Sequence, residues 1–159
     1  MTQQQGYRLF LGASNSVCMD GLLASYYSDS ASVTGTIKIT LPLLNGHCVM
    51  QILEVWIYNY DAQGGSQLVI SGYSYTNKDW YNYHCRAVGA YSNGCRMAHD
   101  GTNYCILLGT TSTVWKYPKV WLTRWIGGYA DCAQMYSNGL PTISLITSES
   151  GYTITGSAS

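Results

Sequence analysis

The side chains that could carry covalent chemistry in this sequence are few, and they form no recognisable catalytic pattern. His47, His84 and His99 are the only near-neutral bases that could activate a serine or cysteine nucleophile. The sequence contains no Gly-x-Ser-x-Gly turn. His99 directly precedes an Asp-Gly dipeptide, which favours a place beside a turn. We therefore predict no catalytic residues and no enzyme activity.

The carboxylates offer a second route to catalysis, because glycoside hydrolysis uses a pair of Asp or Glu side chains. Most of the eight carboxylates lie in segments that we predict as turns. Glu54 is the exception, since it lies in the middle of a predicted strand among aromatic residues. We expect it to pair with Arg124 or Arg96 rather than to act as an acid.

Cofactor and metal motifs are missing from the sequence. It contains no phosphate-binding glycine loop and no calcium loop of spaced acids. The six cysteines form no Cys-x-x-Cys, and neither His47-Cys48 nor His84-Cys85 has the close paired spacing of structural zinc sites. We predict no cofactor, no metal and free thiols. Cys85, Cys95 and Cys105 recur every ten residues, so a β-meander would bring them onto neighbouring strands, where export would make a bridge plausible.

The aromatic residues give the strongest chemical signal. The chain has 15 tyrosines and 5 tryptophans but only one phenylalanine, and rings that carry a polar group are favoured at wet binding surfaces. They are dense between residues 73 and 83, where amides and a carboxylate accompany them. Sugar rings stack on such aromatic faces, and amides bind their hydroxyls without net charge. The candidate ligand-binding residues are Asn77, Asp79, Trp80, Tyr81 and Tyr83. The alternative is that Trp80 and Tyr81 fill the end of the core.

The apolar pattern that must position these residues has a period of two. Ile37, Ile39, Leu41 and Leu43 share one face of a predicted strand, which Pro42 should end or confine to an edge. The segment 49–60 is apolar or aromatic on both faces, so something must cover each of them. Glycines near 61–66 predict a hairpin to a strand at 67–76, and turns at 93–94 and 100–101 extend this to a meander ending near residue 109. Further strands are predicted at 114–115, 119–126, 142–147 and 152–155.

These short strands predict an all-β antiparallel sandwich resembling a jelly roll, with no helix. Residues 14–32 read as a loop after a strand at 6–12, so we separate an N-terminal segment, 1–32, from a sandwich over 33–159, within what is best described as one domain. Charged residues make up 10% of the chain and balance to zero, which excludes an electrostatic nucleic-acid binder. No apolar run is long enough to insert in a membrane, and the first five residues predict no signal peptide.

Four blocks follow one another in an informative order. They are VWIYNY at 55–60, ISGYSY at 70–75, HDGTNYCILLG at 99–109 and TVWKYPKVWLT at 113–123, with Trp80-Tyr81 between the second and third. Together they resemble C-terminal domains of phage tail fibres and of phage-derived fibres of bacteria, over about residues 33–155. The extra residues around 131–138 and the cysteine content depart from that pattern.

The resemblance implies the distal tip of a homotrimeric fibre, on a virion tail or a cell-surface fibre, with no cofactor. Its partners would be two further copies of the chain and a host or prey surface component, most commonly a glycan. A trimer agrees with the doubly apolar strands, and the candidates for the second face are Trp56, Tyr58, Tyr73, Trp121 and Trp125. The alternative is that these rings fill the core between the sheets and leave the aliphatic face outward, because a shift of one residue in register exchanges the two faces. Two alternatives remain: a structural domain that trimerises the fibre without a ligand, and a fragment of a glycan-depolymerising enzyme.

Overall fold

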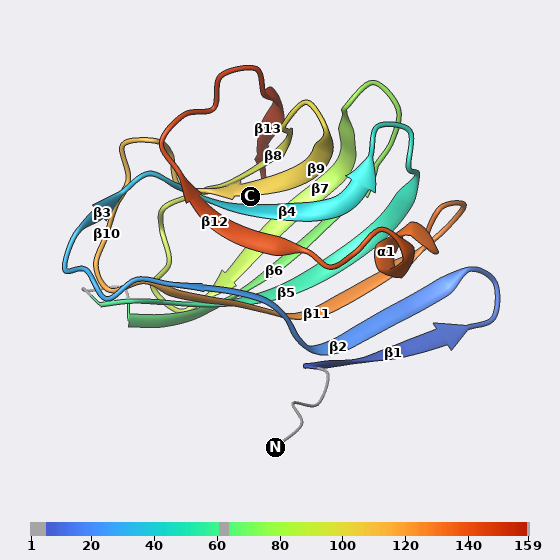
Figure 1. Ribbon diagram of the computed structural model, residues 1–159, viewed down its shortest axis with the longest axis horizontal. Helices are drawn as coiled ribbons and strands as arrows, with labels where there is room; N and C mark the ends of the chain where they lie inside the picture. Colours follow the sequence, from blue (N-terminus) through green and yellow to red (C-terminus); the bar gives the residue numbers. More distant parts are fainter. Residues whose placement is uncertain (1–5, 61–63, 159) are drawn as a thin grey trace.

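Two antiparallel sheets packed face to face form the molecule, and the computed structural model describes residues 6–60 and 64–158 (Figure 1). The larger sheet has the strand order β1-β2-β11-β5-β6-β7, and the smaller one the order β12-β4-β9-β8-β13. The larger sheet comprises β1 (Tyr7–Gly12), β2 (Ser16–Tyr27), β11 (Lys119–Gly128), β5 (Val49–Asn59), β6 (Gly64–Ser74) and β7 (Trp80–Val88). The smaller sheet comprises β12 (Thr142–Ile146), β4 (Thr36–Leu44), β9 (Asn103–Leu108), β8 (Cys95–His99) and β13 (Thr153–Ala158). This confirms the predicted β-sandwich.

Three short elements complete the fold. β3 (Val33–Thr34) and β10 (Val114–Trp115) pair with each other at one end of the sandwich. A single turn of helix, α1 (Gln134–Ser137), lies at the other end and buries Met135, contrary to the prediction of no helix, because four residues are too short to show a helical period in the sequence. In the part of the chain that is described, no helix has the length and apolar character needed to cross a membrane.

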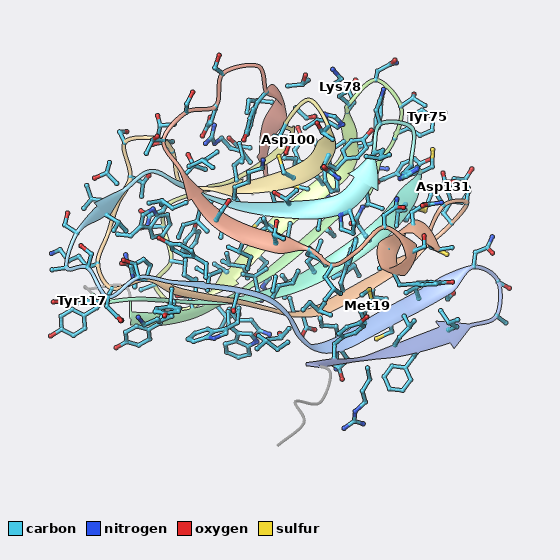
Figure 2. All side chains as sticks on the ribbon, viewed as in Figure 1. Met19, Tyr75, Lys78, Asp100, Tyr117 and Asp131 are labelled. Atoms are coloured by element: carbon cyan, nitrogen blue, oxygen red, sulfur yellow. The ribbon has the colours of Figure 1, made fainter. Side chains whose placement is uncertain are left out.

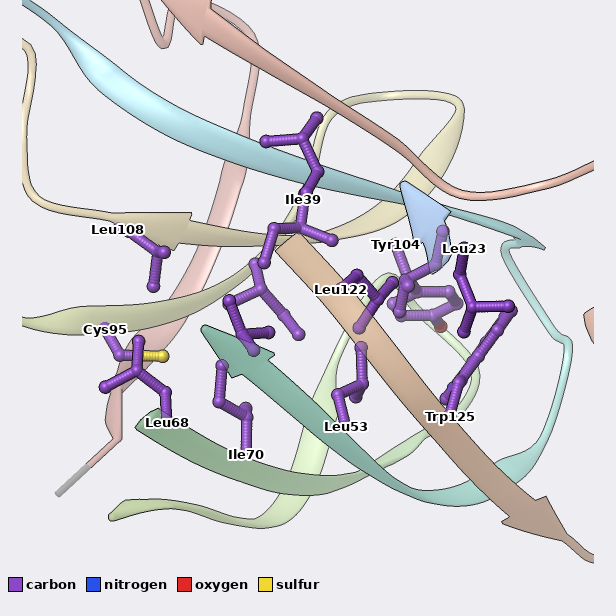
Figure 3. Packing of buried hydrophobic residues seen from close by; sticks show 14 of the residues in the cluster. Leu23, Ile39, Leu53, Leu68, Ile70, Cys95, Tyr104, Leu108, Leu122 and Trp125 are labelled. Carbon is purple, nitrogen blue, oxygen red and sulfur yellow. The ribbon is translucent and has the colours of Figure 1, made fainter. Parts of the chain in front are cut away.

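The core between the sheets follows the alternation read from the sequence (Figure 3). Ile37, Ile39, Leu41 and Leu43 of β4 all point inward and are fully buried. Alternate residues of β5, from Val49 to Ile57, do the same on the opposite sheet. The strand continues through Pro42 to Leu44, contrary to expectation. The reason is that the ladder to β12 has already ended at Thr40 and the ladder to β9 shifts register there, so the missing N–H of proline breaks little.

The predicted meander is correct for the β5–β6 and β8–β9 hairpins and wrong for the connection from β7 to β8. β5 pairs with β6, and Asp100-Gly101 joins β8 to β9 as expected. The Asn93-Gly94 turn, however, lies in the connection from β7 to β8, which carries the chain from one sheet to the other. The same turn chemistry serves a hairpin and a crossover, so local sequence did not distinguish them.

The first 32 residues contribute two strands to the larger sheet, and the expectation of a loop at 14–32 is wrong. β2 lies between β1 and β11, but its alternation is interrupted. Asp20 pairs with Arg124 and Ala24 with Leu122, so three residues of β2 stand opposite Thr123 alone. Gly21 is the bulge residue there, with φ of 135° and no room for a side chain against the backbone of β1. The bulge breaks the period of two that would have identified the strand.

The same irregularity changes the face of Trp125. A strict alternation along β11 would put Trp121 and Trp125 on one face. The register shift between Leu122 and Arg124 turns Trp125 inward instead, where it is fully buried and its indole N–H donates to Gln51 Oε1 at 2.8 Å. Trp125 therefore belongs to the core and not to the outer face.

The two sheets differ in what covers their outer faces. The connection from β12 to β13 folds over the smaller sheet, where Tyr152 packs beside Cys105 and Leu107. Glu149 accepts two hydrogen bonds from Arg96 of β8, at 2.6 and 2.8 Å, and Lys38 of β4 binds both Asp100 and Tyr152. No described segment covers the larger sheet in this way, and many large side chains on its outer face are exposed.

We predict that Glu149→Gln destabilises the fold in a pH-dependent way. The hydrogen bonds from Arg96 outweigh burial and hold the pKa of Glu149 below its ordinary value. The carboxylate therefore stabilises the fold above about pH 4.3, the ordinary Glu pKa, and this contribution is lost as the pH falls through the lower folded pKa. Urea unfolding should show a loss of about 1–3 kcal/mol at pH 7 that shrinks near pH 3.

The matched control is Asp29→Asn, whose exposed carboxylate pairs with Lys119 at the surface. It should change the free energy of unfolding by less than about 1 kcal/mol at either pH. An effect of Glu149→Gln that is equal at pH 7 and pH 3 would contradict the role given to its charge.

Candidate functional site

The outer face of the larger sheet is divided into two parts by a row of charges. Arg124 on β11 lies between Asp20 on β2 and Glu54 on β5, with nitrogen to oxygen distances of 3.3 and 3.6 Å. This confirms Arg124 as the partner expected for Glu54. On one side of the row lie Tyr27, Trp56, Tyr58 and Trp121, which we call the aromatic face; on the other side lies a groove.

The groove has a volume of about 460 Å³ and crosses the ends of β11, β5 and β6. Met50, Ile52 and Ile126 supply apolar walls, whereas Ser16, Ser71 and Gly128 supply small side chains or none. The hollow follows from this mixture, because large residues on neighbouring positions would have filled the surface. Its lining is mainly apolar with a few hydroxyl and amide groups, as in many ligand sites.

Four tyrosines stand together beside the groove, and one of them, Tyr73, lines it. Tyr73 lies at the centre, with ring centroids 5.2 Å from Tyr75, 6.5 Å from Tyr81 and 5.8 Å from Tyr129. Tyr75 and Tyr81 also meet edge to face at 5.6 Å. A second hollow of about 290 Å³ among Tyr73, Tyr75 and Tyr81 adjoins the groove. We call these four residues the tyrosine cluster; Figure 2 shows Tyr75 at the opposite end of the molecule from Tyr117.

A bulge in β7 brings an amide to the same place. Ser71 pairs with His84 and Tyr73 with Tyr81, so Asn82 and Tyr83 stand opposite Gly72 alone. Asn82 has φ of 48°, a left-handed conformation that asparagine tolerates better than most residues. Its exposed side chain lines both hollows and supplies a donor and an acceptor next to the rings.

The polar groups of this site are uncharged. Desolvation and the neighbouring Cys48 thiol raise the pKa of Tyr73 to about 12, so its hydroxyl stays protonated at neutral pH. Ser16, Ser71 and Asn82 carry no charge either. The arrangement can therefore stack apolar faces and exchange hydrogen bonds with a neutral ligand.

The aromatic face is flat by comparison. Trp56 and Trp121 are direct cross-strand partners at its centre, and they are 45% and 38% exposed. Tyr58 and Tyr27 flank them, and the Lys119 ammonium lies 5.0 Å from the centre of the Tyr27 ring. Two neighbouring tryptophans left this open are unusual on a water-facing sheet.

The sequence-predicted site residues are only partly brought together. Tyr81 lies in the tyrosine cluster and is 46% exposed. The prediction that Trp80 binds a ligand is wrong. Its side chain is 2% exposed, and its indole N–H donates to Ala98 O at 2.9 Å. The ring therefore fills the core and cannot stack on a ligand. It points inward because it precedes Tyr81 on an edge strand that alternates faces. Tyr83 also points inward, packing half-buried against the core near Gly156.

Asn77 and Asp79 lie in the turn between β6 and β7. Asn77 and Lys78 both have φ of 62°, and the Asp79 amide donates to Thr76 O at 3.3 Å. This turn chemistry explains the asparagine without a ligand. The turn follows Tyr75 but does not line the groove.

Sequence reasoning missed Tyr129. It counted Tyr73, Tyr75 and Asn82 in the segment rich in rings and amides but did not include them among the candidate ligand-binding residues. Tyr75 and Tyr73 were in the recognised aromatic segment, so their alternation with the inward Ser74 could have identified them. Tyr129 follows β11 and reaches Tyr73 of β6 because β11 and β6 lie on either side of β5 in the sheet. No sequence signal predicted the Asn82 bulge.

The histidine and cysteine side chains that could act as nucleophiles or metal ligands are explained by their structural surroundings. His99 is buried and its Nδ1 accepts from the Gly101 amide at 3.0 Å, which confirms its role beside the turn. All six cysteines are unbridged. Among the described residues, no three His, Cys, Asp or Glu side chains gather closely enough to hold a metal ion.

The chain was compared with protein-family models, with curated proteins and with solved structures. None of the three comparisons finds a match.

Proposed function

We propose that this chain is the receptor-binding tip of a homotrimeric fibre, on a phage tail or a phage-derived bacterial fibre, and that it binds a cell-surface glycan. The observation that carries the proposal is the groove bordered by the tyrosine cluster on an uncovered sheet face. The partners are two further copies of the chain and the glycan.

The shape and chemistry of the groove support a saccharide ligand. Its volume of about 460 Å³ falls in the range typical of sites for small molecules. The rings offer flat apolar surfaces to the C–H face of a sugar, and Asn82, Ser16 and Ser71 offer partners for its hydroxyls. The chain has no net charge, which agrees with a neutral ligand such as a saccharide.

The carboxylates favour binding over hydrolysis. Five of them form ion pairs: Asp20, Asp29, Glu54, Asp100 and Glu149. Asp131 accepts a hydrogen bond from the Cys48 amide at 2.8 Å. None of these six lines the groove, so a general acid and base for a bound glycan would have to come from elsewhere.

The aromatic face supports association between copies of the chain. Trp and Tyr dominate the energetics of protein interfaces, and the pair Trp56 and Trp121 sits at the centre of this face. The row Asp20, Arg124 and Glu54 gives it a polar border whose charges are already paired within the chain. Three copies would bring three grooves to one tip, which raises avidity for a repetitive surface.

We predict that the purified domain binds members of a glycan array and isolated cell envelopes, and that Tyr81→Ala weakens this binding about tenfold. Loss of one stacking ring removes about 1.4 kcal/mol, which corresponds to that factor. Titration calorimetry with the best array ligand measures it. Tyr117→Ala, an exposed tyrosine at the opposite end, is the matched control and should bind as the parent does.

Equal losses in the Tyr81 and Tyr117 variants would contradict the groove as the site. Absence of binding to every glycan and envelope, in a folded trimer, would favour the purely structural alternative. Shortened polysaccharide products after incubation would favour the enzyme.

We predict that Trp56→Glu converts the assembly into monomers. A carboxylate at the centre of an interface would be buried without a partner, which is strongly unfavourable. Light scattering coupled to size exclusion should give three times the 17.5 kDa chain mass for the parent and one chain mass for the variant. Leu140→Glu changes an exposed apolar residue outside the sheets and should leave the mass unchanged. A parent that is monomeric at micromolar concentration would defeat the trimer.

A further inference from the structure

We propose that Cys85 and Cys95 are a dithiol site that oxidises to a disulfide linking the two sheets. The proposal is independent of the glycan-binding function. Cys85 is on β7, an edge strand of the larger sheet, and Cys95 is on β8 of the smaller sheet. Both point into the space between the sheets, and both line one hollow of about 210 Å³ at the edge of the sandwich.

The fold brings these two thiols together. The chain leaves β7, crosses through residues 89–94 and enters β8 in the other sheet, so Cys85 and Cys95 lie in opposite layers, and both pack against the core between them. β7 and β8 approach each other at this edge of the sandwich, and both thiols border the same hollow. The other four cysteines lie on different elements and line no part of this hollow.

The two thiols differ in the way that a stepwise oxidation needs. Cys85 is half-buried, and its interaction with Cys95 lowers the pKa of Cys85, which favours its thiolate. Cys95 is 2% exposed, and the interaction with Cys85 together with burial raises its pKa, so it stays protonated. Cys85 is therefore the attacking group and Cys95 the resolving one.

The oxidant is a low-molecular-weight disulfide such as oxidised glutathione, which reaches the pair through the hollow. The Cys85 thiolate attacks one glutathione sulfur, forming a mixed disulfide and releasing one glutathione thiolate. That thiolate takes up the Cys95 proton as the Cys95 sulfur attacks Cys85, and the second glutathione leaves as a thiolate, which takes from solvent the proton that Cys85 released on ionising. The protein loses two electrons and two hydrogens, and one oxidised glutathione becomes two reduced ones.

Tryptic mapping tests the pairing directly. Cleavage after Lys78, Arg86 and Arg96 separates the two cysteines into the peptides 79–86 and 87–96, each with a single cysteine. The folded chain is incubated with oxidised glutathione, and the remaining thiols are blocked in denaturant with N-ethylmaleimide before digestion. We expect the two peptides as one disulfide-linked species, while the peptides that hold Cys18, Cys48, Cys105 and Cys132 carry N-ethylmaleimide.

Three variants identify the order of events. Cys95→Ser should stop at the mixed disulfide, with glutathione on Cys85. Cys85→Ser should leave Cys95 blocked only by N-ethylmaleimide, because its thiol is buried. Cys105→Ser, the matched control, should still yield the linked peptides. The bridge closes a short loop, so the unfolding midpoint should rise by about 5 °C on oxidation and return on reduction.

Recovery of both peptides as separate N-ethylmaleimide adducts after oxidation of the folded chain would overturn the proposal. Linkage of either peptide to a different cysteine would do so as well. An unfolding midpoint that falls on oxidation would show that the bridge strains the sandwich, and would contradict a stabilising site.

Discussion

Every sheet of a sandwich has an inner face that makes the core and an outer face that meets water, a further segment or a partner. In this chain the same two sheets meet that requirement differently. The connection between β12 and β13 covers the smaller sheet and is fastened by Glu149 to Arg96 and by Tyr152 to Lys38. The larger sheet keeps its outer face open, with tryptophans and tyrosines where charged residues would ordinarily stand.

This asymmetry is the reason that the binding we propose is assigned to the larger sheet. The inner alternation of β5 and β11 builds the core, and the positions between those core residues become the aromatic face and the groove walls. The row Asp20, Arg124 and Glu54 separates the two, so one sheet offers a flat area suited to another protein copy and a hollow suited to a small ligand. The low charge of the chain is consistent with this use of neutral aromatic groups.

Regular alternation made the fold predictable from sequence. The inward residues of β4 and the two faces of β5 follow the period of two, and the Asp100-Gly101 turn joins the strands expected of it. The failures occur where that period is interrupted. The bulge at Gly21 hid β2, and its counterpart in β11 turned Trp125 into the core. The crossover after β7 depends on which sheet has room for the next strand, which no local pattern encodes.

The candidate site was harder to predict than the fold for the same reason. The aromatic segment from 73 to 83 was recognised, but the sheet face on which a ring lies determines whether it is exposed to solvent. Trp80 and Tyr81 are adjacent, yet Trp80 is buried in the core and Tyr81 is exposed. Tyr129 and Asn82 join the site through a neighbouring strand and a bulge, respectively. Contacts of this kind depend on tertiary structure and leave no trace in spacing.

The central claim is that partners bind the open face of the larger sheet. Hydroxyl-radical footprinting tests it, by comparing the oxidation of the isolated chain at low concentration with that of the chain on cell envelopes. The account predicts protection of Trp56 and Trp121 as copies assemble and of Tyr75 and Tyr129 on envelopes, with Tyr152 unchanged. Protection confined to the smaller sheet and the 147–152 connection, with all of those rings still oxidised, would contradict it.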